Sequence, residues 1–195
     1  MLDDDEPARI AALRALEPRL RSVWALLCAE RALVQYRKFH DRTKRGDAFL
    51  AECLAERLWG DLGGDPLSPL ECEASAARLH DLVPREDLPE EAALRALACA
   101  FRARSRGGDP LDAACAGRHV VDLADYLAQQ ALGLAQSATW SDAHEARVRA
   151  HPLVQQELAR QERDLRELQA LGDDARDVFE KLKARAASEA ADLLD

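Results

Sequence analysis

One group of side chains in this sequence has the types and spacing that suit metal binding. Cys115, His119 and Asp122 are separated by steps of four and three residues, which places all three on one face of a helix. Thiolate, imidazole and carboxylate groups are the usual protein ligands of zinc. Three ligands along one straight helix seldom converge on a single ion without a partner from elsewhere. The same residues also fit a semi-exposed helix edge, so we predict no metal and no cofactor and keep them as the candidate metal set.

Motifs for other kinds of catalysis are absent from the sequence. Neither Gly63-Gly64 nor Gly107-Gly108 precedes the Lys-Ser/Thr pair of a nucleotide-binding loop. No serine lies in a G-x-S-x-G turn, and no Cys-x-x-Cys pair occurs. We therefore predict no catalytic residues, and an enzyme is the less favoured interpretation.

Two clusters of basic residues raise the alternative of weak nucleic-acid binding. One runs from Arg37 to Arg45, and the other consists of Arg102, Arg104 and Arg106. Both clusters lie where we expect a helix to end, and the dipole of a helix C-terminus attracts basic side chains without any ligand. The sequence therefore does not favour a nucleic-acid partner.

A charged pair follows an apolar run and must find partners inside the fold. Glu30 and Arg31 come directly after Val23 to Ala29, so one of them faces inward. We expect it to meet Gln156 or Glu157 of a late helix, or the indole of Trp59. This arrangement is either a polar network that fixes helix register or the lining of a pocket. The pocket would use Glu30, Arg31, Tyr36, Asp47, Trp59, Gln156 and Glu157.

The elements that must position these residues are helices. The sequence has 38 Ala and 31 Leu but only 8 Val, 2 Thr and 1 Ile, so the residues that favour strands are nearly absent. Gly and Pro fall between stretches with helical periodicity. We predict an all-α, single-domain bundle of about eight helices over residues 1–195, with mostly antiparallel neighbours and frayed ends at 1–6 and 188–195. The segment from Pro110 to Gln136 is the predicted central helix.

Charge and cysteine usage indicate a cytoplasmic protein. The net charge is -9, and the five cysteines are odd in number and too dilute for a disulfide scaffold. The longest apolar run, Val23 to Ala29, is far too short to span a bilayer. Asp3-Asp4-Asp5 has the wrong charge for a signal peptide.

Two blocks of sequence resemble the YjaG-like family of bacterial proteins, a domain of unknown function. The first block contains Glu30-Arg31, Tyr36, Phe39, Thr43, Gly46-Asp47, Leu54, Leu58 and Trp59. The second, His151 to Glu157, is similar to the family's Asn-Pro-x-Val-x-x-Glu segment, with His151 in place of Asn. The resemblance covers residues 18 to 185 and implies an all-helical fold and a bacterial, cytoplasmic setting. It supplies no reaction.

The functional prediction is a non-catalytic helical interaction protein. Acidic charge and the lack of a catalytic motif favour a partner protein or self-association. A stripe on the late helices is the candidate dimer surface: Leu158, Leu165, Leu168 and Leu171. The alternatives are a small-molecule or metal-binding protein and a weak nucleic-acid binder. No membrane association is expected.

Overall fold

The fold is all-α. The computed structural model describes residues 6–83, 91–134, 141–171 and 176–191, and within these ranges the chain forms nine helices and no strand. The helices are α1 (Glu6–Ala15), α2 (Pro18–Thr43), α3 (Ala48–Gly63), α4 (Pro69–Leu82), α5 (Glu91–Ser105), α6 (Pro110–Ala131), α7 (Asp142–Arg149), α8 (Pro152–Ala170) and α9 (Arg176–Ala191). The predicted fold class is confirmed, with one helix more than the predicted number.

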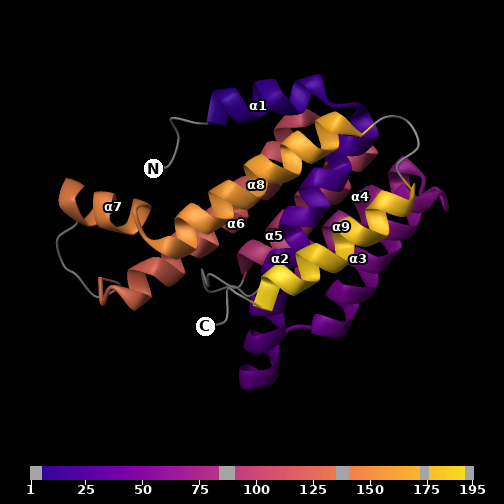
Figure 1. The fold of residues 1–195 in the computed structure, drawn as a ribbon. Helices are drawn as coiled ribbons and strands as arrows, with labels where there is room; N and C mark the ends of the chain where they lie inside the picture. Colours follow the sequence, from indigo (N-terminus) through magenta and orange to yellow (C-terminus); the bar gives the residue numbers. More distant parts are fainter. Residues whose placement is uncertain (1–5, 84–90, 135–140, 172–175, 192–195) are drawn as a thin grey trace.

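Helix α2 is the central element, and this corrects the prediction that the helix beginning at Pro110 would be central. It packs against α3, α5, α6, α8 and α9. Figure 1 shows α2 running through the middle of the molecule, with α8 and α9 lying across it. Every residue from Val23 to Ala29 is fully buried or nearly so. A helix that is apolar all round its circumference must be enclosed on every side, and this run already carried that signal in the sequence.

Short-range signals set most helix ends. Pro18, Pro69, Pro110 and Pro152 occupy the first turns of their helices, where the missing N–H costs no hydrogen bond. The Asp109 carboxylate accepts hydrogen bonds from two backbone amides at the start of α6. Ser68 and Glu71 form a reciprocal capping box on α4. His151 Nδ1 accepts a hydrogen bond from Leu153 N, as expected for the residue that precedes Pro152.

Neighbouring helices are mostly antiparallel, as predicted. Helices α4, α5 and α6 pack in sequence order, and α5 also contacts α2 over much of its length. Helix α7 projects at one end of the molecule, whereas α3 and α4 lie toward the other (Figure 1). The end predicted at Gln136 for the helix that begins at Pro110 lies outside the described residues.

The late helices present their leucine stripe to the interior. Leu165 and Leu168 are buried in the main core, and Leu171 packs against it. Leu158 packs against a smaller core formed with Val154 and Val148. Leu158 and Leu171 are only partly buried, so self-association through this stripe stays a prediction.

The ends of the chain and its relation to membranes can be stated only for the described residues. Helix α9 continues to Ala191 and buries Ala190, inside the segment predicted to fray. No helix in the described part of the chain has the length and apolarity needed to cross a bilayer.

Candidate functional site

Two packed helices bring a pair of cysteines together. Helices α5 and α6 form an antiparallel hairpin about the turn at Gly107 and Gly108. Cys99 lies eight residues before Gly107 and Cys115 lies eight residues after it, so the hairpin places them at matching heights. His119 follows Cys115 by four residues and shares its helix face.

The three side chains form a compact cluster. The sulfur atoms of Cys99 and Cys115 and a ring nitrogen of His119 all lie within 4.8 Å of one another. Cys115 Sγ is 3.5 Å from His119 Nε2. Cys99 is fully buried, whereas Cys115 and His119 are partly exposed. We call these three residues the thiol cluster.

A guanidinium group lies at the buried edge of the thiol cluster. Arg102 Nη2 is 2.9 Å from Cys99 Sγ, and Arg102 Nε donates to Asp112 Oδ1 at 3.3 Å. Asp112 also pairs with Arg106 at 3.0 Å. Positive charge is thus held beside the sulfurs by an acidic residue one turn before Cys115.

These contacts separate the acidities of the two thiols. The hydrogen bond from the Cys99 thiol lowers the pKa of Cys115, and the contact with His119 lowers it further. The same hydrogen bond, together with burial, raises the pKa of Cys99. Both effects favour the thiolate form at Cys115 over Cys99.

The thiol cluster overlaps the sequence-predicted metal set in two of its three residues. Cys115 and His119 meet as their spacing predicted, but the third member is Cys99 and not Asp122. Asp122 lies one turn beyond His119, where burial raises the pKa of its carboxyl group. Sequence reasoning missed Cys99 because it lies on another helix. The equal spacing of the two cysteines about the glycine turn was the available signal.

A second polar cluster fills the space between α2 and α8. Arg31 is completely buried, and it donates to Glu157 Oε2 at 3.1 Å and to Glu157 Oε1 at 3.0 Å. It also donates to Asp164 Oδ2 at 2.7 Å. Burial acts to lower the pKa of Arg31, but attraction to the two carboxylates outweighs it and raises that pKa. We call Arg31, Glu157 and Asp164 the buried ion cluster.

Helix α9 adds further charges to the rim of the buried ion cluster. Arg185 donates to Asp164 Oδ1 at 2.7 Å, and Glu189 lies 3.9 Å from Arg31 Nη1. Gln161 Nε2 donates to Glu157 Oε1 at 2.8 Å. Each charged group of the buried ion cluster thus has an oppositely charged or hydrogen-bonding partner, which is the condition for keeping ions inside a protein.

The seven residues of the sequence-predicted pocket make separate contacts. Arg31 pairs with Glu157, as expected for one of the two possible arrangements. Glu30 lies on the other side of α2 and accepts a hydrogen bond from Trp59 Nε1 at 2.8 Å. At the end of α2, the Tyr36 hydroxyl accepts a hydrogen bond from Asp47 N at 3.0 Å. Gln156 is exposed.

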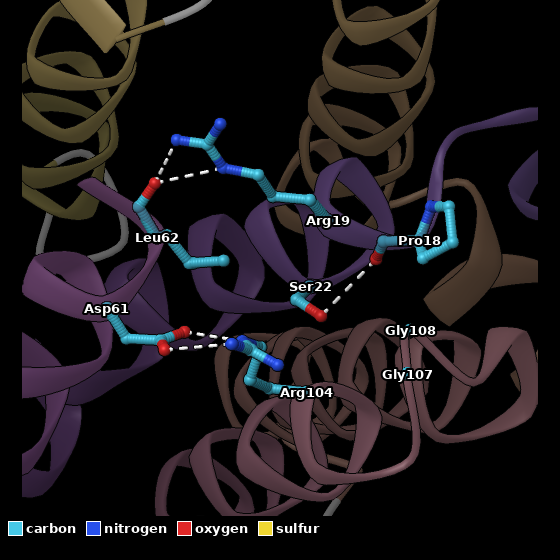
Figure 2. Close-up of a pocket in the computed structure, with 8 residues that line it drawn as sticks. All are labelled: Pro18, Arg19, Ser22, Asp61, Leu62, Arg104, Gly107 and Gly108. Atoms are coloured by element: carbon cyan, nitrogen blue, oxygen red, sulfur yellow. Dashed lines mark hydrogen bonds and ion pairs between the residues drawn. The ribbon is translucent and has the colours of Figure 1, made fainter. Parts of the chain in front are cut away.

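A cavity of about 260 Å³ lies between the start of α2 and the ends of α3 and α5. Figure 2 shows its polar groups turned toward one another. Arg104 pairs with Asp61 through two hydrogen bonds of 2.5 and 3.0 Å, and Arg19 donates to the carbonyl of Leu62. Because these donors already have acceptors, the cavity offers little to a charged ligand.

Comparisons with known proteins agree with the helical fold. The family model described as "Protein of unknown function (DUF416)" matches residues 9–191. The crystal structure of a DUF416 family protein from Shewanella baltica OS155 is similar, with a TM-score of 0.74 and 19% sequence identity over 92% of this chain and 93% of the other. No curated protein shows significant sequence similarity. The resemblance to a helical family of unknown function is thereby confirmed at that level.

Proposed function

The chain belongs to the DUF416 family of proteins of unknown function, and we propose that it binds a thiophilic metal cation of the Zn²⁺ or Cu⁺ class. The observation that carries the proposal is the mutual distance of 4.8 Å or less among the ligand atoms of Cys99, Cys115 and His119. Two thiolates and one imidazole are soft donors that select these cations over magnesium or calcium. The name YjaG-like and the bacterial, cytoplasmic setting stay predictions.

The distance between Cys115 and His119 is close to what a shared metal ion requires. Zn–S bonds of about 2.3 Å and Zn–N bonds of about 2.0 Å at tetrahedral angles put neighbouring ligand atoms roughly 3.6–3.8 Å apart. The distance between Cys115 Sγ and His119 Nε2 is 3.5 Å. Since Cys99 comes from a different helix, the donors surround a point instead of forming a row along α6. Three protein donors leave a fourth position for water or another ligand.

The charge around the cluster also suits a bound cation. Deprotonation of Cys99 and Cys115 supplies two negative charges, which balance a divalent ion. Arg102 Nη2 donates a hydrogen bond to Cys99 Sγ at 2.9 Å, and a metal ion bound by this sulfur would replace that hydrogen bond. The hydrogen bond from Arg102 to Asp112 would remain. Cys115 already favours the thiolate form because the Cys99 thiol and His119 lower its pKa. Metal binding should therefore weaken as the solution becomes acidic.

Titration of the reduced protein with Co²⁺ and Zn²⁺ tests this proposal. We expect about one Co²⁺ per chain, with the charge-transfer absorption of a cobalt–thiolate bond, and displacement of cobalt by Zn²⁺. Cys99→Ser, Cys115→Ser and His119→Gln should each lower the affinity by about 100-fold or more, since even indirect partners of a ligand contribute 10–100-fold. The matched control is Cys72→Ser, which removes a buried thiol outside the thiol cluster and should leave the titration unchanged.

Asp122→Asn distinguishes the two candidate ligand sets, because Asp122 belongs to the set predicted from sequence and not to the thiol cluster. If metal binding is lost in Asp122→Asn and kept in Cys99→Ser, the donors assigned here are wrong. Absence of thiolate-to-cobalt absorption in the wild-type protein at micromolar metal would contradict the proposal as a whole.

Partner binding and nucleic-acid binding have less support. Among the described residues, the large apolar side chains that are exposed are widely separated in the sequence: Phe49, Leu70 and Leu111. Single exposed residues of this kind are common on proteins without partners. Arg102, Arg104 and Arg106 each pair with a carboxylate, which weakens the positive potential that nucleic acid requires. The interaction hypothesis stays a prediction that light scattering of the purified chain can test.

A further inference from the structure

The two thiols of the cluster differ in access to solvent. Cys115 is partly exposed on α6, whereas Cys99 is fully buried behind it on α5. Both sulfurs lie within the same 4.8 Å group. A small reagent can therefore reach Cys115 first, and Cys99 is the sulfur positioned to react with whatever forms on Cys115.

Polar groups surround the two sulfurs. Cys115 Sγ lies 3.5 Å from His119 Nε2, and Cys99 Sγ lies within 4.8 Å of Cys115 Sγ. Arg102, 2.9 Å from Cys99 Sγ, adds positive charge beside the pair. Partial exposure and a neighbouring thiol are features of redox-reactive cysteines. The remaining buried thiols lack this combination: Cys28 and Cys72 are not members of the thiol cluster, and burial raises the pKa of each.

We propose that, in the metal-free protein, Cys115 and Cys99 form a dithiol that reduces hydroperoxides and becomes an intramolecular disulfide. In the first step the Cys115 thiolate attacks the terminal oxygen of the hydroperoxide. An S–O bond forms, the O–O bond breaks, and the leaving alkoxide takes a proton from solvent. Cys115 is then a sulfenic acid.

In the second step the sulfur of Cys99 attacks the sulfur of Cys115. An S–S bond forms and the S–O bond breaks, and the departing hydroxide combines with the proton of the Cys99 thiol as water. The sum is two thiols and one hydroperoxide giving one disulfide, one alcohol and one water. The sulfurs must move from within 4.8 Å to about 2.05 Å of each other for the disulfide to form.

This activity uses the same sulfurs as the proposed metal site but does not require that a metal binds. If the metal proposal also holds, the disulfide removes two of the three donors, so peroxide would release the cation. Bound metal would in turn protect the thiols from oxidation. Peroxide and metal would thus compete for one site.

The test is single-turnover oxidation of reduced, chelator-treated protein with hydrogen peroxide. We expect the intact mass to fall by two hydrogen atoms. Trypsin cleaves after Arg95, Arg102, Arg106 and Arg118, so a disulfide should join peptides 96–102 and 107–118. The yield of joined peptides should not depend on protein concentration, because both thiols belong to one chain.

Variants assign the two roles. In Cys99→Ser the reaction should stop at sulfenic acid on Cys115, which dimedone traps, and in Cys115→Ser the joined peptides should be absent. Cys72→Ser should react as the wild type does, and Cys53→Ser removes the exposed thiol that could link two chains. Circular dichroism of each variant checks that it is folded. The peptide map of the wild-type protein tests the proposal even if a variant does not fold.

Two results would overturn the proposal. The first is a wild-type map without the joined peptides, and the second is a yield of joined peptides that rises with protein concentration. Cobalt titration under reducing conditions reports on the metal site independently. Joined peptides without metal binding would support the dithiol and refute the metal proposal, whereas metal binding without joined peptides would do the reverse.

Discussion

Replacing Arg31 with methionine is expected to lower the free energy of unfolding by about 3–5 kcal/mol, because it leaves buried carboxylates without their cation. Arg31 is fully buried and bonds both Glu157 and Asp164. Methionine fills part of the volume, so most of the loss reflects unpaired charge and not a cavity. Urea unfolding followed by circular dichroism measures the change.

The matched control lies on the same helix. Arg37 pairs with Glu52 at 2.6 Å, but their side chains are 56% and 37% exposed, so Arg37→Met should change the free energy of unfolding by no more than about 1 kcal/mol. Adding Glu157→Gln to Arg31→Met neutralises one of the two buried carboxylates that lost their cation, so it should recover part of the lost free energy of unfolding. Equal effects of Arg31→Met and Arg37→Met would contradict a stabilising role for the buried ion cluster.

Arg31→Met also distinguishes the two interpretations of this region. If the sequence-predicted pocket existed around Arg31, the variant would lose ligand binding at temperatures where it is still folded. The contacts favour the structural interpretation, because Arg31, Glu157 and Asp164 are all occupied by one another. We expect the variant to keep metal binding at the thiol cluster below its lowered melting temperature.

The helix ends were predictable from sequence because their causes are local. Pro110 and Asp109 act within one turn of α6, and Ser68 acts on Glu71 only three residues away. The central position of α2 was also readable, since the run from Val23 to Ala29 needs cover on every face. The prediction that placed the later helix at the centre relied on the uncharged stretch from Tyr126 to Ser141 and gave less weight to the apolar run in α2.

The thiol cluster was only partly predictable because one of its three residues joins it through tertiary packing. The spacing of Cys115 and His119 sets their contact within one helix, and that part was found. Cys99 joins them only because α5 and α6 pack as an antiparallel pair. The contact between Arg31 and Asp164 spans 133 residues and depends in the same way on which helices meet. Local sequence patterns do not indicate which distant helices pack against each other, so these contacts could not be predicted.

The turn that creates this hairpin depends on a close approach of two backbones. Gly108 has a φ of +78°, and a Cβ atom built there would lie 2.2 Å from the carbonyl oxygen of Pro18. Figure 2 shows Gly108 beside Pro18 at the start of α2. Arg21 donates to the Gly108 carbonyl at 3.0 Å, which ties the turn to α2 a second time. Neither helix can yield easily, because the obstructing atoms are backbone.

Gly108→Ala is therefore expected to lower the free energy of unfolding by about 3–4 kcal/mol, of which roughly 1–2 kcal/mol comes from the left-handed backbone and the rest from steric displacement. Gly107 is the matched control: its φ is +66°, but a Cβ there meets nothing within 4 Å. Gly107→Ala should cost only the backbone part, about 1–2 kcal/mol. Paired urea unfolding curves give the difference directly. If the two variants are equally stable, the contact with Pro18 does not hold the hairpin against α2, and the alignment of Cys99 with Cys115 must have another cause.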